Sequence, residues 1–426
     1  MKENATTTNK KRIKPGLPGG FRDYGPREAR MKQWILDTAR RTFELFGFEP
    51  LETSAVQKTE VLTGGESDSR KIIYNVRGSQ EQESDTSLRF DLTVPLARFV
   101  ASNPDIPKPF KRYEIGRVWR GERQQAGRYR EFTQADADIV GSSSPAADTE
   151  IAAVIYTVLK NLGMDNFVIK INDRKEFDSL PSSAGFADAK LWDALRIIDK
   201  KDKIGEAGVK EDLGKTFGDK VAGNIAAFIA ARPATAGTLA EIRQGFTALG
   251  IPDRYYAIDR AMVRGLSYYT GPVFEAVLTD APEIGSIFGG GRYDNLVMSF
   301  TGQKIPAVGA SLGVDRLIAA MEKLGLTPPE KMSRTALVLN LDPALASEYQ
   351  ALGAQLRAAG IPTALYMGNE SSFQGQLAYA VKKDIPYVII WGSEEKKNGV
   401  VSIKNLATRE QKEIPREKIV EYFLPS

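Results

Sequence analysis

The stretch FKRYEIGRVWRGE, residues 110–122, together with EFTQADADIVG, residues 131–141, decides the fold of this chain. The composition of both segments predicts strands, and the polar Arg/Gln/Gly sequence between them predicts a long basic loop. Side chains alternate along a strand, so the second segment places an aromatic ring, an amide and two carboxylates on one face: Phe132, Gln134, Asp136 and Asp138. A face this polar inside a sheet predicts the floor of a binding site.

Length and composition indicate a folded chain of several domains. A chain of 426 residues exceeds one ordinary core and suits two or three domains. Its 42% hydrophobic and 26% charged residues exclude disordered, collagen-like and membrane compositions. The net charge of +4 is too small to identify a partner, so any basic surface has to be local.

The chain contains no His and no Cys, and this excludes several kinds of chemistry. Imidazole bases, Ser-His-Asp triads, thiolate nucleophiles, disulfides and iron–sulfur clusters are all ruled out. What remains is chemistry performed by Arg, Lys, carboxylates, hydroxyls, backbone amides and hard cations such as Mg²⁺. These groups are typical of proteins that handle nucleotides and phosphates.

Hydrophobic spacing predicts the other elements. Apolar residues at three- and four-residue intervals predict a helix from residue 26 to about 46, and the same period from about 177 to 249 predicts an inserted helical domain. Strand-type sequence returns at 261–278. After a linker at 326–333, the patterns predict a small α/β domain of order β-α-β-α-β-β.

The N-terminal sequence gives no targeting signal. MKENATTTNKKRIKP lacks an apolar signal stretch, and no window of the chain approaches the roughly 20 apolar residues of a membrane span. The chain is therefore expected in the cytoplasm. The basic start fits either a solvated end or a contact with a polyanion.

A nucleotide site is indicated around the basic loop. Arg120 and Arg128 can hold phosphates through paired hydrogen bonds, Glu122 can accept from an exocyclic amine, and Phe132 can stack on a purine. Together they would bind ATP without a Gly-rich phosphate loop. Taken alone, the WRGER segment also fits a solvated strand edge, and the glycines at 289–291 also fit a tight turn.

The ordered set of motifs resembles the class II aminoacyl-tRNA synthetases, and specifically the histidyl-tRNA synthetase family. Residues 110–141 resemble motif 2 of that class, and VGASLGVDRLIAAM, residues 308–321, resembles motif 3. The two histidine-specific stretches of the family resemble RGLSYYTGPVFEA and GSIFGGGRYDNLV of this chain. The amino-acid loop of the family resembles SLRFDLTVPLARF, and its insertion domain resembles DALRIIDKKDKIGEAGVKEDL. The resemblance covers nearly the whole chain.

The resemblance implies an α/β (α+β) fold: an antiparallel-sheet catalytic core of class II type, with a helical insertion and a C-terminal α/β anticodon-binding domain. It divides the chain into residues 1–172 for the first part of the core (motifs 1 and 2), 173–254 for the insertion, 255–327 for the second part of the core, and 333–426 for the anticodon-binding domain. It also implies a homodimer, formed through the motif 1 helix.

The resemblance also assigns roles in ATP binding. Arg120 is expected on the α-phosphate, Glu122 on the adenine amine and Phe132 against the adenine ring. Arg128 and Arg316 are expected on the outer phosphates, with Mg²⁺ bridging those phosphates and no metal site made by the protein. Arg264 is expected between the α-phosphate and the substrate carboxylate, so Arg120 and Arg264 are the predicted catalytic pair.

For histidine, the resemblance implies that Asp91, Thr93 and Gln134 bind the α-amino group, while Asp138 and Tyr269, beside Tyr268, read the imidazole. A neutral imidazole offers one donor and one acceptor, which suits a carboxylate and a phenol. Plainer interpretations stay open. The two tyrosines could be ordinary residues of a hydrophobic core, and Asp91 could cap a turn. Asp136 could have a structural role only. The lysines of the insertion could simply solvate a helix: Lys200, Lys201 and Lys203.

Some positions depart from the family pattern. Ser267 stands where the histidine-specific stretch usually has Asp, Ser54 stands in the place of the motif 1 proline, and Thr133 and Ala135 also differ from the commoner residues. These departures put the electrostatics near Arg264 and the details of a dimer interface in question.

The implied activity is ATP-dependent activation of L-histidine to histidyl adenylate, followed by transfer to the 3′ end of tRNA(His). Two other functions fit parts of the sequence. One is a catalytically inactive, synthetase-like regulatory subunit of ATP phosphoribosyltransferase, although such proteins generally lack the anticodon-binding module. The other is a general RNA-binding α/β protein, which gives no reason for the ordered motifs.

Overall fold

The computed structural model describes residues 13–64, 72–80, 84–122, 129–231, 237–263, 268–327 and 335–424, without the side chains of residues 202 and 203. The chain divides into two compact units, Met1–Thr327 and Pro328–Ser426. No helix in the described ranges is both long and apolar enough to cross a membrane. Each unit is considered by itself below.

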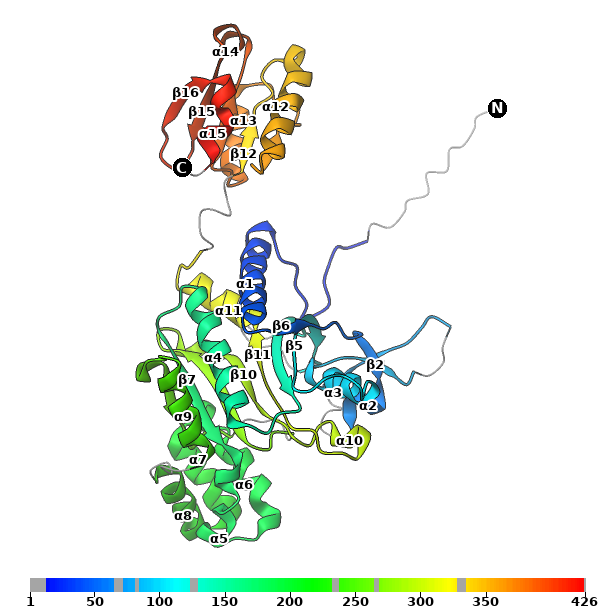
Figure 1. Cartoon of the computed structure of the whole chain (residues 1–426), viewed down its shortest axis with the longest axis vertical. Helices are drawn as coiled ribbons and strands as arrows, with labels where there is room; N and C mark the ends of the chain where they lie inside the picture. Colours follow the sequence, from blue (N-terminus) through cyan, green and yellow to red (C-terminus); the bar gives the residue numbers. More distant parts are fainter. Residues whose placement is uncertain are drawn as a thin grey trace, which may run out of the picture. The chain divides into compact units, whose positions relative to one another are not determined.

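In the described part of the first unit, eight strands form one sheet in the order β1-β5-β6-β11-β10-β9-β7-β8 (Figure 1). The inner strands pair antiparallel, and parallel pairing occurs at the outer pairs β1–β5 and β7–β8. The antiparallel core expected from the sequence is therefore confirmed. The strands are β1 (Glu49–Pro50), β5 (Phe110–Trp119), β6 (Glu131–Val140), β7 (Phe167–Asp173), β8 (Tyr256–Ile258), β9 (Pro272–Leu278), β10 (Ser286–Arg292) and β11 (Ala307–Gly313).

The two strands predicted on either side of the basic loop are β5 and β6. They pair over their full length, from Phe110 opposite Val140 to Trp119 opposite Glu131. Alternation along β6 divides its side chains, because Ala135, Ala137 and Ile139 enter the hydrophobic core while the predicted polar face points the other way. The strand thus has one structural face and one face available for binding.

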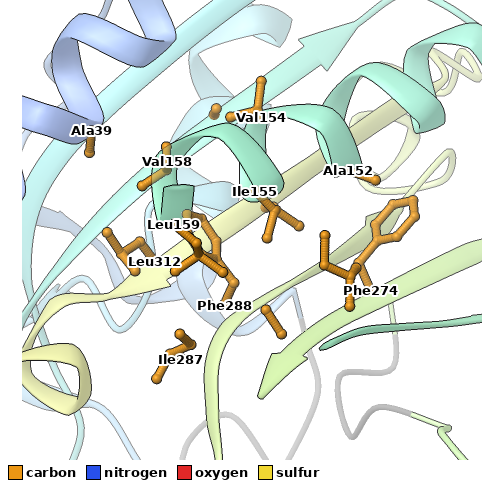
Figure 2. Close-up of a cluster of buried hydrophobic side chains, with 14 of the residues drawn as sticks. Ala39, Ala152, Val154, Ile155, Val158, Leu159, Phe274, Ile287, Phe288 and Leu312 are labelled. Atoms are coloured by element: carbon orange, nitrogen blue, oxygen red, sulfur yellow. The ribbon is translucent and has the colours of Figure 1, made fainter. Parts of the chain in front are cut away.

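The core lies between the sheet and a layer of helices. These helices are α1 (Pro26–Leu45), α4 (Pro145–Asn161), α9 (Thr238–Ala248) and α11 (Val314–Lys323). Figure 2 shows side chains of α4, including Ile155, Val158 and Leu159, packed among Phe274, Phe288 and Leu312 of the strands. The predicted helix from residue 26 is α1, and its buried residues Met31, Ile35, Ala39 and Phe43 recur at four-residue spacing.

The helical region predicted at 177–249 is observed, and it divides between two cores. Its first helices are α5 (Leu180–Ala184), α6 (Leu191–Ile198), α7 (Lys201–Phe217) and α8 (Asp219–Ala230), which enclose a hydrophobic cluster of their own. Helix α9 instead packs against α4 through Leu239, Ile242 and Phe246. A separate three-stranded sheet of β2 (Val56–Lys58), β4 (Thr86–Leu88) and β3 (Tyr74–Val76) lies near α2 (Thr59–Thr63), α3 (Thr93–Ser102) and α10 (Met298–Thr301).

One strand prediction was wrong at its start. Strand-type sequence from residue 261 forms a strand only from Pro272, while residues 264–267 lie outside the described residues. The Asp259 carboxylate accepts the Ala261 N–H at 3.0 Å, and the Asn172 amide donates to the Met262 carbonyl at 2.9 Å. These side-chain bonds occupy backbone groups that a sheet ladder would need.

The second unit has the predicted β-α-β-α-β-β order, with additions. Its described strands are β12 (Ala336–Val338), β13 (Thr363–Leu365), β14 (Tyr387–Ile390), β15 (Val400–Asn405) and β16 (Gln411–Pro415), arranged as β13-β12-β14-β15-β16. Its helices are α12 (Ala346–Ala358), α13 (Phe373–Lys382), α14 (Ser393–Asn398) and α15 (Ile419–Phe423). The sequence patterns missed α14, α15 and the mostly exposed strand β16. Part of the predicted linker at 326–333 lies outside the described residues.

Candidate active site

A cavity of about 640 Å³ lies over the polar face of β6, β10 and β11. Every predicted site residue within the described ranges lines it: Asp91, Thr93, Arg120, Glu122, Phe132, Gln134, Asp138, Tyr268, Tyr269 and Arg316. Arg128 and Arg264 lie outside the described residues. The structure thus brings together groups that are more than 200 positions apart in the sequence.

Arg120 and Phe132 form one side of the cavity, at the open end of the β5–β6 hairpin. The Arg120 Nε donates to the Phe90 carbonyl at 3.0 Å, and its guanidinium carbon lies 5.1 Å from the centre of the Phe132 ring. Because the backbone N–H of Arg120 also bonds the Arg130 carbonyl at 2.8 Å, both main chain and side chain of Arg120 are fixed. The guanidinium and the ring are therefore held together before any ligand binds.

Arg316 lies near the start of α11, directly after strand β11. Its Nη1 donates to the Ser286 carbonyl at 2.7 Å, so this guanidinium is oriented by strand β10. The Glu122 backbone carbonyl accepts from the Arg130 Nε at 3.2 Å. Two guanidinium groups, a carboxylate and an aromatic ring thus meet in one cavity, which is a set of groups able to contact a nucleotide.

Asp91 combines a structural contact with a free carboxylate oxygen. Its Oδ1 accepts the Val94 N–H at 3.0 Å, so the prediction that Asp91 caps a turn is confirmed for this oxygen. Its Oδ2 is buried and has no hydrogen-bond partner among the described residues. Burial raises the pKa of Asp91 to about 6, although Arg120 and Arg112 favour the ionised form. A buried, unpartnered carboxylate oxygen suits a cationic ligand group.

Gln134 has a similar half-satisfied side chain. Its Nε2 donates to the Ser311 hydroxyl at 2.5 Å, while its Oε1 is buried and has no partner within the described part of the chain. An amide oxygen left without a donor costs free energy unless a ligand supplies that donor. Gln134 and Asp91 therefore both offer acceptors to the cavity.

Asp138 is held by two buried groups that sequence reasoning missed. Arg112 approaches its Oδ2 with Nη2 at 3.0 Å, and Tyr293 donates its hydroxyl to Oδ1 at 2.5 Å. Burial raises the pKa of Asp138, whereas Arg112 and Tyr293 lower it. Both missed residues occur in stretches that the sequence singled out, but their burial against Asp138 is a tertiary contact without a local sequence signal.

Asp136 also lines the cavity, on the same face of β6 as Asp138. Burial and the nearby Asp138 charge raise its pKa well above the usual range, while Arg112 opposes this shift. The fully buried Arg112 is thus shared among several carboxylates, and it also lies 3.7 Å from Glu114. The structural role left open for Asp136 is compatible with its place on the cavity wall.

Tyr268 and Tyr269 belong to a hydrophobic cluster and to the cavity wall at once. Their ring centroids are 4.9 Å apart, and Tyr268 lies 6.0 Å from Tyr293. Tyr269 is buried and packs with Leu96 and Val273 in that cluster. Burial and the proximity of Tyr269 and Asp91 raise the pKa of Tyr268 well above the usual range, so its hydroxyl stays protonated. The core interpretation and the binding interpretation are compatible here.

Lys200 and Lys201 of the inserted helical region form ion pairs of their own. Lys200 pairs with Asp212 at 3.2 Å and Lys201 with Glu206 at 2.9 Å, as expected of a solvated helix, and Lys201 also lines the cavity. The side chain of Lys203 lies outside the described residues. Lys170 of β7 also lines the cavity, and it pairs with Asp259 at 3.3 Å. Within the described ranges, no cluster of three or more acidic side chains is arranged to hold a metal ion.

Three of the four positions that depart from the family pattern lie within the described residues. The Ser54 hydroxyl donates to the Val56 carbonyl at 2.9 Å on the surface. Ala135 is fully buried in the core, and the Thr133 N–H donates to the Asp315 carboxylate at 3.1 Å. Ser267 lies outside the described residues.

Comparisons with known proteins agree with this arrangement. The sequence profile for histidyl-tRNA synthetase matches residues 20–317, and that for an anticodon binding domain matches residues 335–425. A histidine–tRNA ligase of Paracoccus denitrificans is 39% identical over 448 aligned positions, covering 93% of this chain and 90% of that protein. The corresponding protein of Ruegeria pomeroyi is 40% identical, with the same coverage.

Solved structures give the same result at the level of the fold. The crystal structure of histidyl-tRNA synthetase from Nostoc sp. PCC 7120 superposes with a TM-score of 0.85 at 32% identity, covering 97% of this chain and 99% of that one. An ATP phosphoribosyltransferase regulatory subunit/histidyl-tRNA synthetase from Bacillus halodurans, 22% identical with a TM-score of 0.69, shares the fold. The profile match over most of the chain and the near full-length relatives establish that this chain belongs to the histidyl-tRNA synthetase family.

Proposed function

We propose that this chain is a histidine–tRNA ligase: it activates L-histidine with ATP to histidyl adenylate and then transfers the histidyl group to the 3′ end of tRNA(His). The observation that carries the proposal is the single cavity lined by Arg120, Arg316, Asp91, Gln134 and Asp138. These residues come from positions 91 to 316 of the sequence. The two arginines can bind phosphates, and Asp91, Gln134 and Asp138 can accept hydrogen bonds from an amino acid.

In the first step the histidine carboxylate attacks the α-phosphorus of ATP, and the bond to the pyrophosphate leaving group breaks. This chemistry needs alignment and charge neutralisation but no protein nucleophile. Arg120 is placed to bind the α-phosphate, with Arg264 as its predicted partner, while Arg316 and Arg128 take the outer phosphates. Mg²⁺ would enter bound to the ATP substrate and would neutralise charge on its phosphates, beside Arg316 and Arg128.

The adenine is assigned to the hairpin end of the cavity. Phe132 offers a ring face for stacking, and the Glu122 carboxylate is expected to accept from the exocyclic amine. The cation–ring contact between Arg120 and Phe132 supports this order, because it places the phosphate-binding group next to the stacking group. In ATP only the ribose separates the adenine from the α-phosphate, so the groups that bind the two are expected close together.

The amino acid is assigned to the floor of the cavity. The unpartnered Asp91 Oδ2 and Gln134 Oε1 are expected to accept from the α-ammonium group, with Thr93 beside them. Asp138 and Tyr269 are expected to contact the two imidazole nitrogens, and Tyr268 packs behind them. A side chain lacking one of these nitrogens would leave a buried partner unsatisfied, and this penalty supplies the selectivity.

In the second step a hydroxyl of the terminal tRNA ribose attacks the carbonyl of the adenylate and releases AMP. We assign recognition of the anticodon of tRNA(His) to the C-terminal domain, residues 333–426, and we keep the division of the remainder into 1–172, 173–254 and 255–327. We also propose a homodimer, in keeping with the motif 1 helix, and a cytoplasmic location, in keeping with an activity that acts on tRNA.

The test is ATP–pyrophosphate exchange with each of the twenty amino acids, followed by charging of purified tRNA(His). Histidine alone should support exchange. In Arg120→Ala, exchange should fall by about 10² to 10³, the usual loss when one preorganised charge stabiliser is removed. Arg117→Ala is a matched control, since Arg117 lies three residues before Arg120, on β5, has a side chain that is 63% exposed, and pairs with Glu131. A protein that binds histidine but supports no exchange would favour the regulatory-subunit alternative.

A further inference from the structure

An N-terminal segment, residues 19–24, lies across the start of β6. The Gly20 carbonyl accepts the Arg130 N–H at 2.8 Å, and the Gly19 carbonyl accepts from the Arg130 Nη1 at 3.1 Å. Gly20 has φ +93°, and a Cβ there would lie 2.5 Å from the Arg130 Cδ. The segment can approach this closely only because residue 20 is glycine.

The same segment reaches α11 through Arg22 and Tyr24. Both side chains donate to the Asp315 Oδ1: the Arg22 Nη2 at 3.2 Å, and the Tyr24 hydroxyl. The Arg22 guanidinium also contacts two aromatic rings, 4.2 Å from the centre of Tyr24 and 4.3 Å from that of Tyr129. Asp315 is only 4% exposed, so its carboxylate depends on these partners for compensation.

Asp315 in turn connects two parts of the nucleotide-binding wall. Its Oδ2 accepts the Thr133 N–H at 3.1 Å, which fixes β6 directly after Phe132. Asp315 itself directly precedes Arg316, so its position sets where the Arg316 side chain begins. Arg22 and Tyr24 therefore contact Asp315, and Asp315 is connected to the chain neighbours of both Phe132 and Arg316: it accepts from Thr133 and directly precedes Arg316.

Arg130, which the N-terminal segment contacts through Gly19 and Gly20, also contacts two other residues assigned to the nucleotide, Arg120 and Glu122. The Arg130 carbonyl accepts the Arg120 N–H at 2.8 Å, and the Arg130 Nε donates to the Glu122 carbonyl at 3.2 Å. On the histidine side, Asp91 is held by Val94, and Asp138 by Arg112 and Tyr293. Gln134 directly follows Thr133 on β6, but its side-chain amide is held by Ser311. The N-terminal segment is thus connected to the nucleotide half of the site, and on the histidine side it approaches the backbone of Gln134.

We propose that Arg22 and Tyr24 are positioning residues for ATP: through Asp315 and the segment they anchor, they hold the nucleotide half of the cavity in its binding geometry. The inference rests on the proposed function. Neither side chain lines the cavity, so their effect is transmitted through Asp315 and Arg130. Loss of either contact should weaken ATP binding while leaving histidine binding intact.

The test uses the full-length chain with Arg22→Gln and Tyr24→Phe, and measures KM for ATP and for histidine in pyrophosphate exchange. Each variant should raise KM for ATP about tenfold, the usual effect of losing a hydrogen bond to a buried charge, with KM for histidine within about twofold. Arg22→Lys should restore part of the loss because it returns the cation. Arg27→Gln is the matched control: Arg27 is exposed, lies in the first turn of α1 just after the segment, and should leave both constants unchanged.

The outcomes separate the two proposals. If the unmodified protein supports no histidine-dependent exchange, the proposed function fails. If it does, and KM for ATP is unchanged in the variants, or KM for histidine rises equally, the positioning role is wrong. Tyr24→Phe keeps the aromatic ring and removes only the hydroxyl, so it remains a valid test if Arg22→Gln does not fold, as monitored by circular dichroism.

Discussion

At the scale of single residues, the site is built from carboxylates that are costly to bury. Asp91, Asp136 and Asp138 are each at most 3% exposed, and burial raises the pKa of all three. Arg112 is the fully buried cation that opposes this effect at each of them. Burial alone would favour the protonated, neutral forms of these carboxyl groups. The site nevertheless concentrates carboxylates there, because they can bind the ammonium group of an amino acid.

Asp91→Asn should stabilise the protein at neutral pH while impairing histidine binding. The pKa of Asp91 in the folded chain, about 6, lies above the ordinary 3.8, so folding favours the protonated form. The ionised carboxylate then lowers the free energy of unfolding progressively as pH rises from about 4 to 6, by about 3 kcal/mol in total. Asparagine avoids this loss and keeps an oxygen to accept the Val94 N–H.

Urea unfolding at pH 7 and at pH 4 measures the effect. The variant should be more stable than the unmodified chain at pH 7, and the difference should shrink at pH 4, where the native carboxyl is protonated. Asp105→Asn, at an exposed position, serves as the control and should change neither value. A variant that is less stable at pH 7 would contradict the burial argument.

Residue-level prediction from sequence succeeded where a motif fixed the residue types and failed where partners are distant. The described nucleotide and histidine residues all reached the cavity. Arg112, Tyr293 and the Arg22–Asp315 pair were not foreseen, because the last pair is separated by 293 positions and no periodicity relates its members. Arg112 also occupies a strand position where a charge usually indicates solvent, and only its burial among carboxylates reveals its role.

At the scale of elements, the close pairing of β10, β11 and β6 depends on glycine. A Cβ on Gly290 would lie 2.2 Å from the Gly309 carbonyl, and a Cβ on Gly309 would lie 1.8 Å from the Asp138 Oδ1. The glycine run that looked ambiguous in the sequence therefore has a structural reason within β10, since Gly290 leaves room for the backbone of β11, while Gly309 of β11 leaves room for the Asp138 carboxylate. A tight turn, the other interpretation, is not observed at residues 289–291.

Gly309→Ala should displace the Asp138 carboxylate from Arg112 and Tyr293. Because Asp138 is expected to read the imidazole, KM for histidine should rise at least tenfold, the scale of a lost charged hydrogen bond, while KM for ATP changes little. Pyrophosphate exchange with varied histidine and varied ATP separates the two constants. Gly223→Ala in α8 adds its methyl group in open space and is the control. An unchanged KM for histidine would argue against the role of Asp138.

Element prediction was most accurate where one periodicity ran without interruption. The strands β5 and β6 and the helix α1 match their predicted ranges closely, because ten or more residues of each repeat one pattern. The strand expected from residue 261 was wrong because Asp259 and Asn172 bind the backbone there. Strand β16 was missed because QKEIP is almost entirely exposed and lacks the apolar alternation that marks a half-buried strand.

At the scale of the whole molecule, each unit has hydrophobic clusters of its own. In the second unit, Leu352 and Ile389 belong to one cluster, and Leu337 and Val388 to another. All the lining residues within the described ranges lie between Asp91 and Arg316, within the first unit. The order of the domains followed from sequence because helical and strand periods alternate in blocks and a Pro-Pro pair separates the last block.

Because the cavity is confined to the first unit, a chain of residues 1–327 should retain histidine-dependent pyrophosphate exchange within about threefold of the full chain, while charging of tRNA(His) falls by at least 10². Adenylation needs only the residues that line the cavity. Selection of tRNA is assigned to the second unit, so loss of that unit should weaken the affinity for tRNA by several factors of ten. Exchange and charging assays on the same preparation measure both. A chain of residues 328–426 should unfold cooperatively by itself, as expected of a domain with its own core. A shortened first unit that stays folded, by circular dichroism, yet loses exchange would show that adenylation depends on the second unit and would overturn this division of labour.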